Sequence, residues 1–375
     1  MPTLLVLREH APGETRVAAT PDTVRRMVKA GHRILVERGA GLGAQSADDA
    51  FVDAGAEIVD GPSGTRADIL LAVNPPEDLE SLDSGALLVS FLWPAADPAR
   101  VRRIAGRGLS CFAMDQVPRI TRAQRMDALS SQSNIAGYKA VLLGANHLPK
   151  IFPLLMTAAG TIRPAKVVVM GAGVAGLQAI ATARRLGAVV EVSDVRAAVK
   201  EQVESLGASF IELDDSETLE GDGGYAKEAS KEFLARQQAK VRTHVVAADV
   251  VITTALVPGR RAPVLVTADM VAEMRSGSVI VDLAVEQGGN CELSVPGDVV
   301  TREGVTIVGH RNVPALVPCH ASEVYSRNVL AVVDLLCGES GVEIDLADDI
   351  QVGAMAVHAG EIRCDLPGGP RDEGD

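Results

Sequence analysis

Residues 171–176 read Gly-Ala-Gly-Val-Ala-Gly, a GxGxxG spacing that can hold a pyrophosphate against the backbone. Gly171 permits a tight turn, Gly173 lets a phosphate approach because it has no Cβ, and Gly176 lets a helix pack closely. The free N–H groups of the first helical turn, which begins at Val174, then face the anion. The spacing therefore predicts a dinucleotide site, against the alternative of an ordinary tight turn between strand and helix.

A carboxylate follows about 20 residues after the glycines. Asp194 ends the second strand of this unit, where it can accept hydrogen bonds from the adenosine ribose hydroxyls. A 2′-phosphate would meet its negative charge, so NAD(H) is favoured over NADP(H). The next two residues, Val195 and Arg196, are also candidate cofactor contacts. Arg196 keeps a preference for NADP(H) open, because a nearby arginine is one way to hold a 2′-phosphate.

The elements that must position these residues alternate between strand and helix patterns. Short apolar, β-branched runs predict buried parallel strands, whereas the longer segments between them predict helices. In the glycine-bearing half the predicted strands are residues 167–170, 189–193, 209–213, 250–255, 278–284 and 306–309. Six strands with helices between them predict a complete doubly wound sheet.

The N-terminal part shows the same alternation without a GxGxxG. Its predicted strands are residues 3–7, 33–36, 69–73, 86–92 and 109–114. Residues 130–148 predict a long helix that bridges the two halves. We therefore expect an α/β protein of two Rossmann-like doubly wound domains. Residues 1–129 with about 322–375 would form a discontinuous N-terminal domain, and residues 130–321 the NAD-binding domain.

Composition excludes several classes of protein. A net charge of −13 argues against nucleic acid or an anionic membrane surface as a direct partner. No apolar run reaches the ~18 residues of a membrane-spanning helix. The five cysteines and seven histidines show no ligand spacing, so we expect no metal and reduced thiols, as in a cytoplasmic protein.

A second polar motif, residues 117–131, reads VPRITRAQRMDALSS. Together with the run from MTAAG at residues 156–160 through the glycine loop to VPGD at residues 295–298, it covers nearly the whole chain. In these motifs the chain resembles the NAD(H)-binding domain I of proton-translocating NAD(P) transhydrogenase, the alpha subunit. Because the sequence stops at Asp375, without the membrane helices that some alpha subunits carry, it resembles the split, soluble form.

The resemblance implies hydride transfer from NADH on this chain to NADP⁺ on a partner, coupled to proton translocation. The expected partners are the NADP(H)-binding domain III, the membrane domain II and a second copy of the chain. No direct membrane span is expected, and the chain would lie on the cytoplasmic face of the inner membrane. An NAD-binding regulator without catalysis remains a further class.

The resemblance also assigns roles to the second motif. Arg119, Gln124 and Asp127 would lie around the nicotinamide and its ribose, as the residues of the hydride-transfer site. Ile120 and Thr121 would join them as cofactor contacts, and Ser130 would hold the carboxamide with Asp127. The open alternative is a polar helix N-terminus that Asp127 or Ser130 caps.

Further cofactor contacts are carried over by resemblance. Gly224 and Tyr225 match a mobile loop that closes over bound NAD, against the alternative of a solvated insertion. Gln237 and Leu256 match positions that line the nucleotide, although Leu256 also suits a plain core position. Two further residues, Glu286 and Asn290, either contact the nicotinamide side or hold a turn.

Alanine dehydrogenase shares the fold and supplies the competing function. That enzyme places a Lys and a His where this chain has Asn74 and Trp93, and its catalytic Asp falls at Glu286. Arg16 still matches a substrate-binding arginine. Imine reduction needs a proton donor and a carboxylate clamp, so the missing Lys and His argue against an amino-acid substrate.

Overall fold

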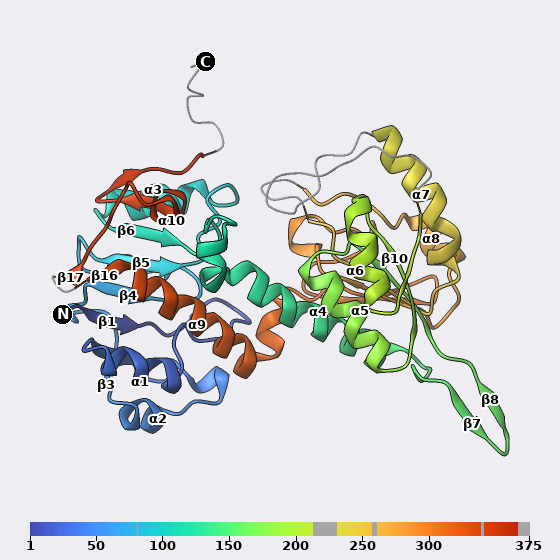
Figure 1. Ribbon diagram of the computed structural model, residues 1–375, viewed down its shortest axis with the longest axis horizontal. Helices are drawn as coiled ribbons and strands as arrows, with labels where there is room; N and C mark the ends of the chain where they lie inside the picture. Colours follow the sequence, from blue (N-terminus) through green and yellow to red (C-terminus); the bar gives the residue numbers. More distant parts are fainter. Residues whose placement is uncertain (81, 213–230, 257–260, 339–340, 367–375) are drawn as a thin grey trace. The chain divides into compact units, whose positions relative to one another are not determined.

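The computed structural model describes residues 1–80, 82–212, 231–256, 261–338 and 341–366, without the side chains of residues 231–237. The chain divides into two compact units (Figure 1). Unit 1 comprises Met1–Gln132 and Ala315–Asp375, and unit 2 comprises Ser133–Pro314. The boundaries expected from the sequence lie nearby, at residues 129/130 and 321/322.

Unit 1 is built on an eight-stranded sheet. Its strands, in spatial order, are β19 (Glu361–Ile362), β18 (Met355–His358), β6 (Ser110–Ala113), β5 (Leu87–Ser90), β4 (Ile69–Leu71), β1 (Thr3–Val6), β2 (Arg33–Glu37) and β3 (Glu57–Val59). The six strands from β6 to β3 are parallel, whereas β18 and β19 pair antiparallel. These two edge strands were not among the strands predicted from the sequence.

Helices cover both faces of the unit 1 sheet. Along β1, Leu4 faces the core beneath α1 and α9, while Leu5 faces the core beneath α3. This burial on both faces explains why the strands read as continuous apolar runs. The helices are α1 (Pro21–Lys29), α2 (Asp48–Asp53), α3 (Pro98–Gly106), α9 (Pro318–Leu336) and α10 (Asp349–Ala354).

Unit 2 contains a seven-stranded sheet, one strand more than predicted. Its order is β11 (Ser209–Phe210), β10 (Val189–Ser193), β9 (Lys166–Met170), β12 (Val250–Thr253), β13 (Val279–Asp282), β15 (Val305–Val308) and β14 (Val299–Arg302). The additional strand, β14, pairs antiparallel with β15, and the other pairs are parallel. Numbered along the chain, the parallel strands follow the Rossmann order 3-2-1-4-5-6.

Five helices pack on this second sheet. Val167 and Val169 of β9 face the core beneath α4, α5 and α6, whereas Val168 and Met170 face the core beneath α7 and α8. The helices are α4 (Ala128–His147), α5 (Val174–Arg185), α6 (Lys200–Ser205), α7 (Lys231–Val246) and α8 (Ala268–Glu273). Unit 1 shows the same parallel strand order, so the expectation of two Rossmann-like folds is confirmed.

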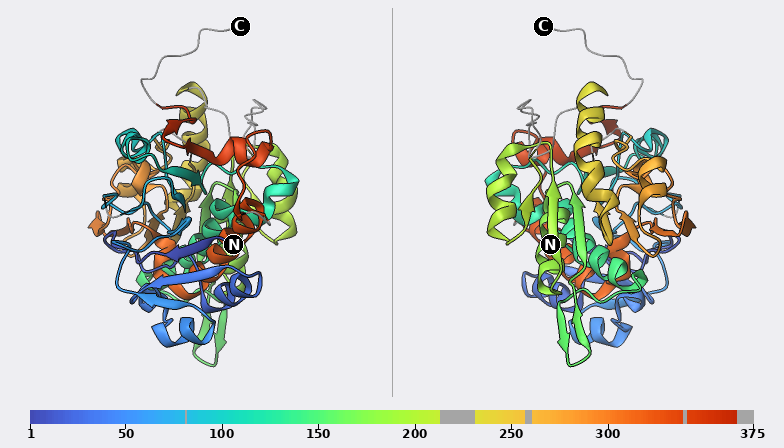
Figure 2. Two further views of the ribbon diagram at one scale, coloured as in Figure 1. Left: turned by 90° about the vertical axis from the view of Figure 1, so that its left-hand side faces the viewer. Right: turned by 90° about the vertical axis from the view of Figure 1, so that its right-hand side faces the viewer.

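A short β-hairpin extends from unit 2, formed by β7 (Leu155–Thr157) and β8 (Gly160–Ile162). Figures 1 and 2 show it as an arm that projects from the body of the unit. All six strand residues are exposed. The sequence analysis did not predict this element.

Candidate functional site

The glycine loop follows β9 and leads directly into α5. Gly171 adopts a φ of +103°, and a Cβ there would lie 2.5 Å from the Oγ1 of Thr254. A Cβ on Gly176 would overlap the carbonyl oxygen of Gly171, so the helix can approach the turn only because this residue is glycine. The structure thus gives these two glycines the turn and packing roles that the spacing predicts.

Gly173 has the opposite environment. Among the described residues, no atom beyond its chain neighbours and its own helix backbone lies within 4 Å of the position that its Cβ would take, and its φ of −76° is one that any residue can adopt. Its backbone therefore faces open space at the N-terminus of the twelve-residue helix α5. Since the strand order reverses between β9 and β12, this space lies where open α/β sheets bind ligands.

Asp194 lies buried at the end of β10, next to the glycine loop. Its Oδ2 accepts a hydrogen bond of 2.6 Å from the backbone N–H of Ala172, which ties the loop to the neighbouring strand. The same carboxylate also pairs with Arg196. The structure therefore brings the predicted acid and the predicted phosphate loop into direct contact.

The remaining predicted contacts of unit 2 are less fully described. Val174 begins α5, and Val195 and Leu256 are half-buried, the latter beyond the end of β12. Gly224 and Tyr225 lie outside the described residues, as does the side chain of Gln237. These assignments stay predictions.

Asn290 and Glu286 each hydrogen-bond to another loop of unit 2. The amide of Asn290 is buried, donates to the carbonyls of Ala255 and Pro263, and accepts from the N–H of Ala255. The Oε2 of Glu286 accepts from the backbone N–H of Asn312 at 3.1 Å.

Two residues that the sequence analysis missed shape the same edge of the sheet. The hydroxyl of Thr254 donates to the carbonyl oxygen of Gly171 at 3.0 Å. The buried carboxylate of Asp282 accepts from the hydroxyls of Thr253 and Ser294 at the end of β13. An acid that ends a buried strand was the available signal for Asp282.

The polar motif of unit 1 forms a 3-10 turn, η2 (Thr121–Met126), which is anchored from below. Ala123 and Met126 are buried in the core that includes α9. The amide of Asn328 on α9 donates to the carbonyl oxygen of Arg125 at 2.8 Å. Arg122 pairs with Asp348 at 2.6 Å, which fixes the loop against the start of α10.

The predicted contact residues of this loop are exposed on that fixed base. Arg119, Ile120, Thr121 and Gln124 all present their side chains at the surface. Because the backbone beneath them is anchored by buried residues, they can contact a ligand without a large ordering cost. The geometry suits a positioning role.

Asp127 caps the long helix α4, which is the alternative that the sequence analysis left open for this residue. Its Oδ1 accepts from the backbone N–H of Ser130 at 2.8 Å, and its Oδ2 accepts from the Ser130 hydroxyl at 2.6 Å. The two residues predicted to hold a carboxamide together are therefore in contact. Their hydroxyl and carboxylate remain at the half-buried start of the helix.

The point of strand reversal in unit 1 is occupied by the protein's own side chains. Glu9, just beyond β1, accepts hydrogen bonds from the backbone N–H of Val73 at 2.6 Å and from the amide of Asn74 at 3.2 Å. The Asn74 amide also donates to Glu14. Burial, reinforced by the charge of Glu14, raises the pKa of Glu9 from 4.5 to about 7, although the hydrogen bonds oppose this shift.

Arg16 is hydrogen-bonded and ion-paired within the same cluster. Its Nε and Nη2 donate to Glu14 at 2.8 and 2.6 Å, and its Nη1 donates to the buried Gln132 at 2.8 Å. The side chains of Arg16 and Glu14 are only 6% and 1% exposed. Their pairing neutralises both charges, which makes this buried arginine tolerable.

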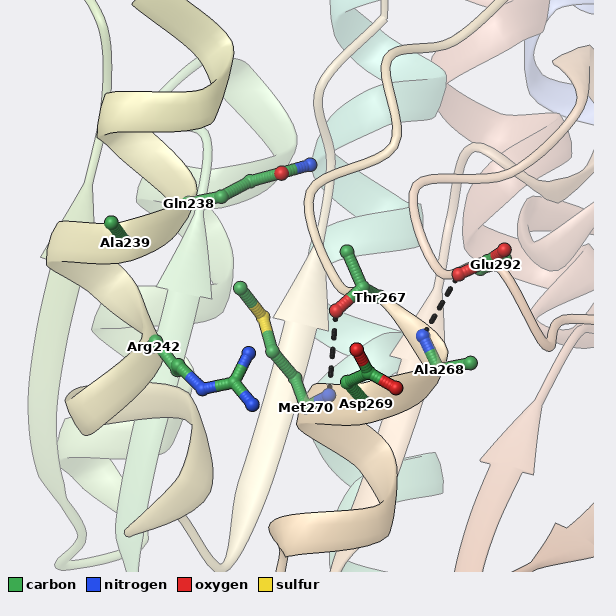
Figure 3. Close-up of a pocket in the computed structure, with 8 residues that line it drawn as sticks. All are labelled: Gln238, Ala239, Arg242, Thr267, Ala268, Asp269, Met270 and Glu292. Carbon is green, nitrogen blue, oxygen red and sulfur yellow. Dashed lines mark hydrogen bonds between the residues drawn. The ribbon is translucent and has the colours of Figure 1, made fainter.

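A surface groove of about 550 Å³ lies between α7 and α8 in unit 2 (Figure 3). Several of its polar groups are paired within the protein: Thr267 accepts from the N–H of Met270, and Glu292 from that of Ala268. Arg242, which also lines the groove, pairs with Glu273. The described residues that line this groove include none of those predicted to bind a cofactor.

Comparisons with known proteins agree with this architecture. Residues 5–136 match the family profile "Alanine dehydrogenase/PNT, N-terminal domain", and residues 140–365 match "Alanine dehydrogenase/PNT, C-terminal domain". The chain is 47% identical to NAD(P) transhydrogenase subunit alpha of Cereibacter sphaeroides, over 95% of this chain and 70% of that protein. Alanine dehydrogenase of Bacillus subtilis is 31% identical, over 93% and 89% of the two chains.

Two further relatives are also transhydrogenases, one found by sequence and one by structure. A polypeptide of Rhodospirillum rubrum, named as the first part of NAD(P) transhydrogenase subunit alpha, is 49% identical over 87% of this chain and 88% of its own length. The solved structure of transhydrogenase from Sinorhizobium meliloti superposes with a TM-score of 0.88 at 42% identity, and the match covers 96% of this chain and 99% of that one.

Proposed function

Because the chain belongs to the alanine dehydrogenase/PNT family, we propose that it is the NAD(H)-binding subunit of a proton-translocating transhydrogenase. It would present NADH for hydride transfer to NADP⁺ on a partner domain. The observation that carries the proposal is the open space in front of Gly173, at the start of α5 and beside Asp194. This arrangement suits the pyrophosphate and ribose of a dinucleotide.

The loop of unit 1 would contact the nicotinamide end. Arg119 and Gln124 are exposed on an anchored turn, and Asp127 with Ser130 offers a carboxylate and a hydroxyl for a carboxamide. The coenzyme itself supplies the hydride, and direct transfer between two rings needs no general acid or base. The chain's residues would therefore orient the ring and exclude water.

The proposed partners are an NADP(H)-binding domain III, a membrane domain II and a second copy of this chain. In the described part of the chain, no helix combines the length and the apolar character needed to cross a membrane. In this proposal the membrane domain II couples hydride transfer to proton movement. We place the complex at the cytoplasmic face of the inner membrane.

The hairpin of β7 and β8 supports the second copy as a partner. Met156 is 72% exposed, and Leu155 and Ile162 are nearly half exposed. An isolated two-stranded hairpin is marginally stable in water, and its free edges favour pairing with another chain. Residues 151–163 contain no acidic residue and one basic residue, Arg163, so the arm carries little of the chain's net charge of −13.

The alternative, an amino-acid dehydrogenase, is disfavoured by the cluster in unit 1. Arg16, the candidate clamp for a substrate carboxylate, is already paired with the carboxylate of Glu14 and donates to Gln132. Asn74 bridges two acids and carries no transferable proton at neutral pH. Where alanine dehydrogenase has its His, this chain has Trp93, and an indole cannot serve as a general acid.

Isotope transfer between nucleotides tests the proposal. NADH labelled with deuterium at C4 is mixed with NADP⁺, the NADP(H)-binding partner and this chain, and the NADPH formed is analysed by mass spectrometry. We expect label in NADPH only when both proteins are present. We expect no NADH oxidation by this chain alone with pyruvate and ammonia. If mixing the two proteins gives no more labelled NADPH than either protein alone, the transhydrogenase assignment is rejected.

Gln124→Asn tests the loop within the same assay. Shortening this side chain should leave NADH affinity within about threefold and slow transfer at least about tenfold, because ring alignment controls the rate. Gln202→Asn, the same change on exposed α6, is the matched control and should leave transfer unchanged. Unaltered transfer by Gln124→Asn would remove Gln124 from the site.

A further inference from the structure

The carboxylate of Asp194 has no acceptor capacity left for a ribose. Its Oδ2 accepts from Ala172 N at 2.6 Å and from Arg196 Nη2 at 2.8 Å. Its Oδ1 accepts from Arg196 N at 2.8 Å and from Arg196 Nε at 2.9 Å. A carboxylate offers about four acceptor sites, and all are used here.

These four donors are not equivalent. The N–H groups of Ala172 and Arg196 belong to the backbone and stay in place as long as the loop keeps its shape. Nε and Nη2 belong to a side chain, which can rotate away. Ribose hydroxyls can therefore reach Asp194 only by taking the positions that the guanidinium occupies.

In this ion pair, the positive charge of the Arg196 guanidinium is neutralised by Asp194. The side chains of Asp194 and Arg196 are 5% and 14% exposed, so their attraction is poorly screened by water. A guanidinium can bind a phosphate in the same planar, bidentate geometry that it uses here for a carboxylate. While Asp194 binds Arg196 in this way, a 2′-phosphate would have to compete with a carboxylate that repels it.

We propose that Arg196 is a latent receptor for a 2′-phosphate, which Asp194 holds in a closed ion pair and which the ribose hydroxyls of NAD(H) displace. The pair, rather than Asp194 alone, sets the preference for NAD(H) over NADP(H). This inference rests on the proposed binding of NAD(H) and adds a specificity-determining residue to that site.

A double-mutant cycle tests this coupling. The affinities of the full-length chain for NADH and NADPH are measured by nucleotide fluorescence in the wild type, Asp194→Asn, Arg196→Ala and the double variant. Asp194→Asn should raise the NADPH:NADH affinity ratio by about 100-fold, because an amide neither repels the phosphate nor retains the guanidinium as strongly. In that background, Arg196→Ala should lower NADPH affinity at least about tenfold.

With Asp194 present, Arg196→Ala should change NADPH affinity less than about threefold, since the arginine is already sequestered. Arg185, exposed on α5, provides the charge-matched control. Arg185→Ala combined with Asp194→Asn should retain the NADPH gain. Thermal unfolding of each variant verifies folding, and Asp194→Gly replaces Asp194→Asn if the latter is unfolded.

The outcomes separate the two proposals. If Arg196→Ala lowers NADPH affinity equally with and without Asp194, or if Asp194→Asn gains no NADPH affinity, the latent-receptor inference is overturned while NAD(H) binding stands. If the wild type binds no NADH, the proposed function fails and the inference falls with it.

Discussion

Gly173 and Gly176 lie three residues apart in one motif, the first at the N-cap of α5 and the second inside that helix, and they meet opposite surroundings. The first faces open space, whereas the second abuts the carbonyl oxygen of Gly171. The residue type is the same, but in the proposed function the first faces a ligand, whereas the second serves packing. Substitution by alanine separates the two roles.

Gly173→Ala should weaken NADH binding at least about tenfold, because the new methyl group would occupy the space proposed for the pyrophosphate. Its backbone angles suit alanine, so stability should be unchanged or rise by up to about 1 kcal/mol. Gly176→Ala should instead lower the unfolding free energy by about 1–3 kcal/mol through overpacking. Calorimetric titration and urea unfolding measure the two effects. Unaltered binding by Gly173→Ala would contradict the proposed phosphate position.

Glu9 makes stability depend on pH. Its pKa is raised from 4.5 to about 7 in the folded protein, so the folded state binds the proton more tightly than the unfolded state. The resulting stabilisation is complete below about pH 4.5 and is lost as pH rises through about 7.

Glu9→Gln removes this titration. The stability of the variant relative to wild type should increase by up to about 3 kcal/mol between pH 4.5 and pH 8, an upper bound since Glu9 is partly exposed. Urea unfolding across this pH range measures the difference. A difference that stays constant with pH would show that Glu9 titrates normally.

Elements at the sheet edges are where the chain departs from its parallel plan. The antiparallel strands β18, β19 and β14 cover edges that parallel crossovers leave open. The hairpin of β7 and β8 does the reverse, because it carries two free edges and exposed apolar side chains away from the unit 2 sheet. Such an arm gains stability only by packing against another surface.

Met156→Asp should therefore dissociate the proposed dimer. A charge at this exposed apolar position would oppose burial in an interface, while the unit 2 core remains untouched. Sedimentation at several protein concentrations measures the oligomeric state. Val52→Asp, which alters an exposed apolar residue on α2, is the control and should leave the dimer intact. A wild-type monomer, or a dimer that tolerates Met156→Asp, would exclude the hairpin as the contact.

Across the whole molecule, two sheets share one parallel strand order but treat their points of reversal differently. Unit 2 leaves the space before Gly173 open, whereas unit 1 fills the equivalent position with Glu9 and Asn74. A repeated Rossmann-like fold therefore carries only one glycine-rich candidate site. The Rossmann-like fold of unit 1 instead supports the anchored loop that presents Gln124.

The sequence by itself determined the features that neighbouring residues encode. Apolar runs predicted the parallel strands, and the GxGxxG with Asp194 located the turn and the acid, because a strand, its turn and the next helix are contiguous in the chain. The end of α5 and the N-cap of α3 follow from the local residues Gly187 and Asp97. The resemblance supplied the roles of the loop residues, which the fold does not test.

Only the tertiary structure decided which polar groups meet. Asp194 could be placed at a strand end, but its saturation by Arg196 and Ala172 depends on how two strands and a loop pack. Glu9 meets Val73 across 64 residues, and its pKa follows from burial that no local pattern encodes. The edge strands were missed for the same reason: their pairing is selected by an unfilled sheet edge, which exists only after the rest of the chain has folded.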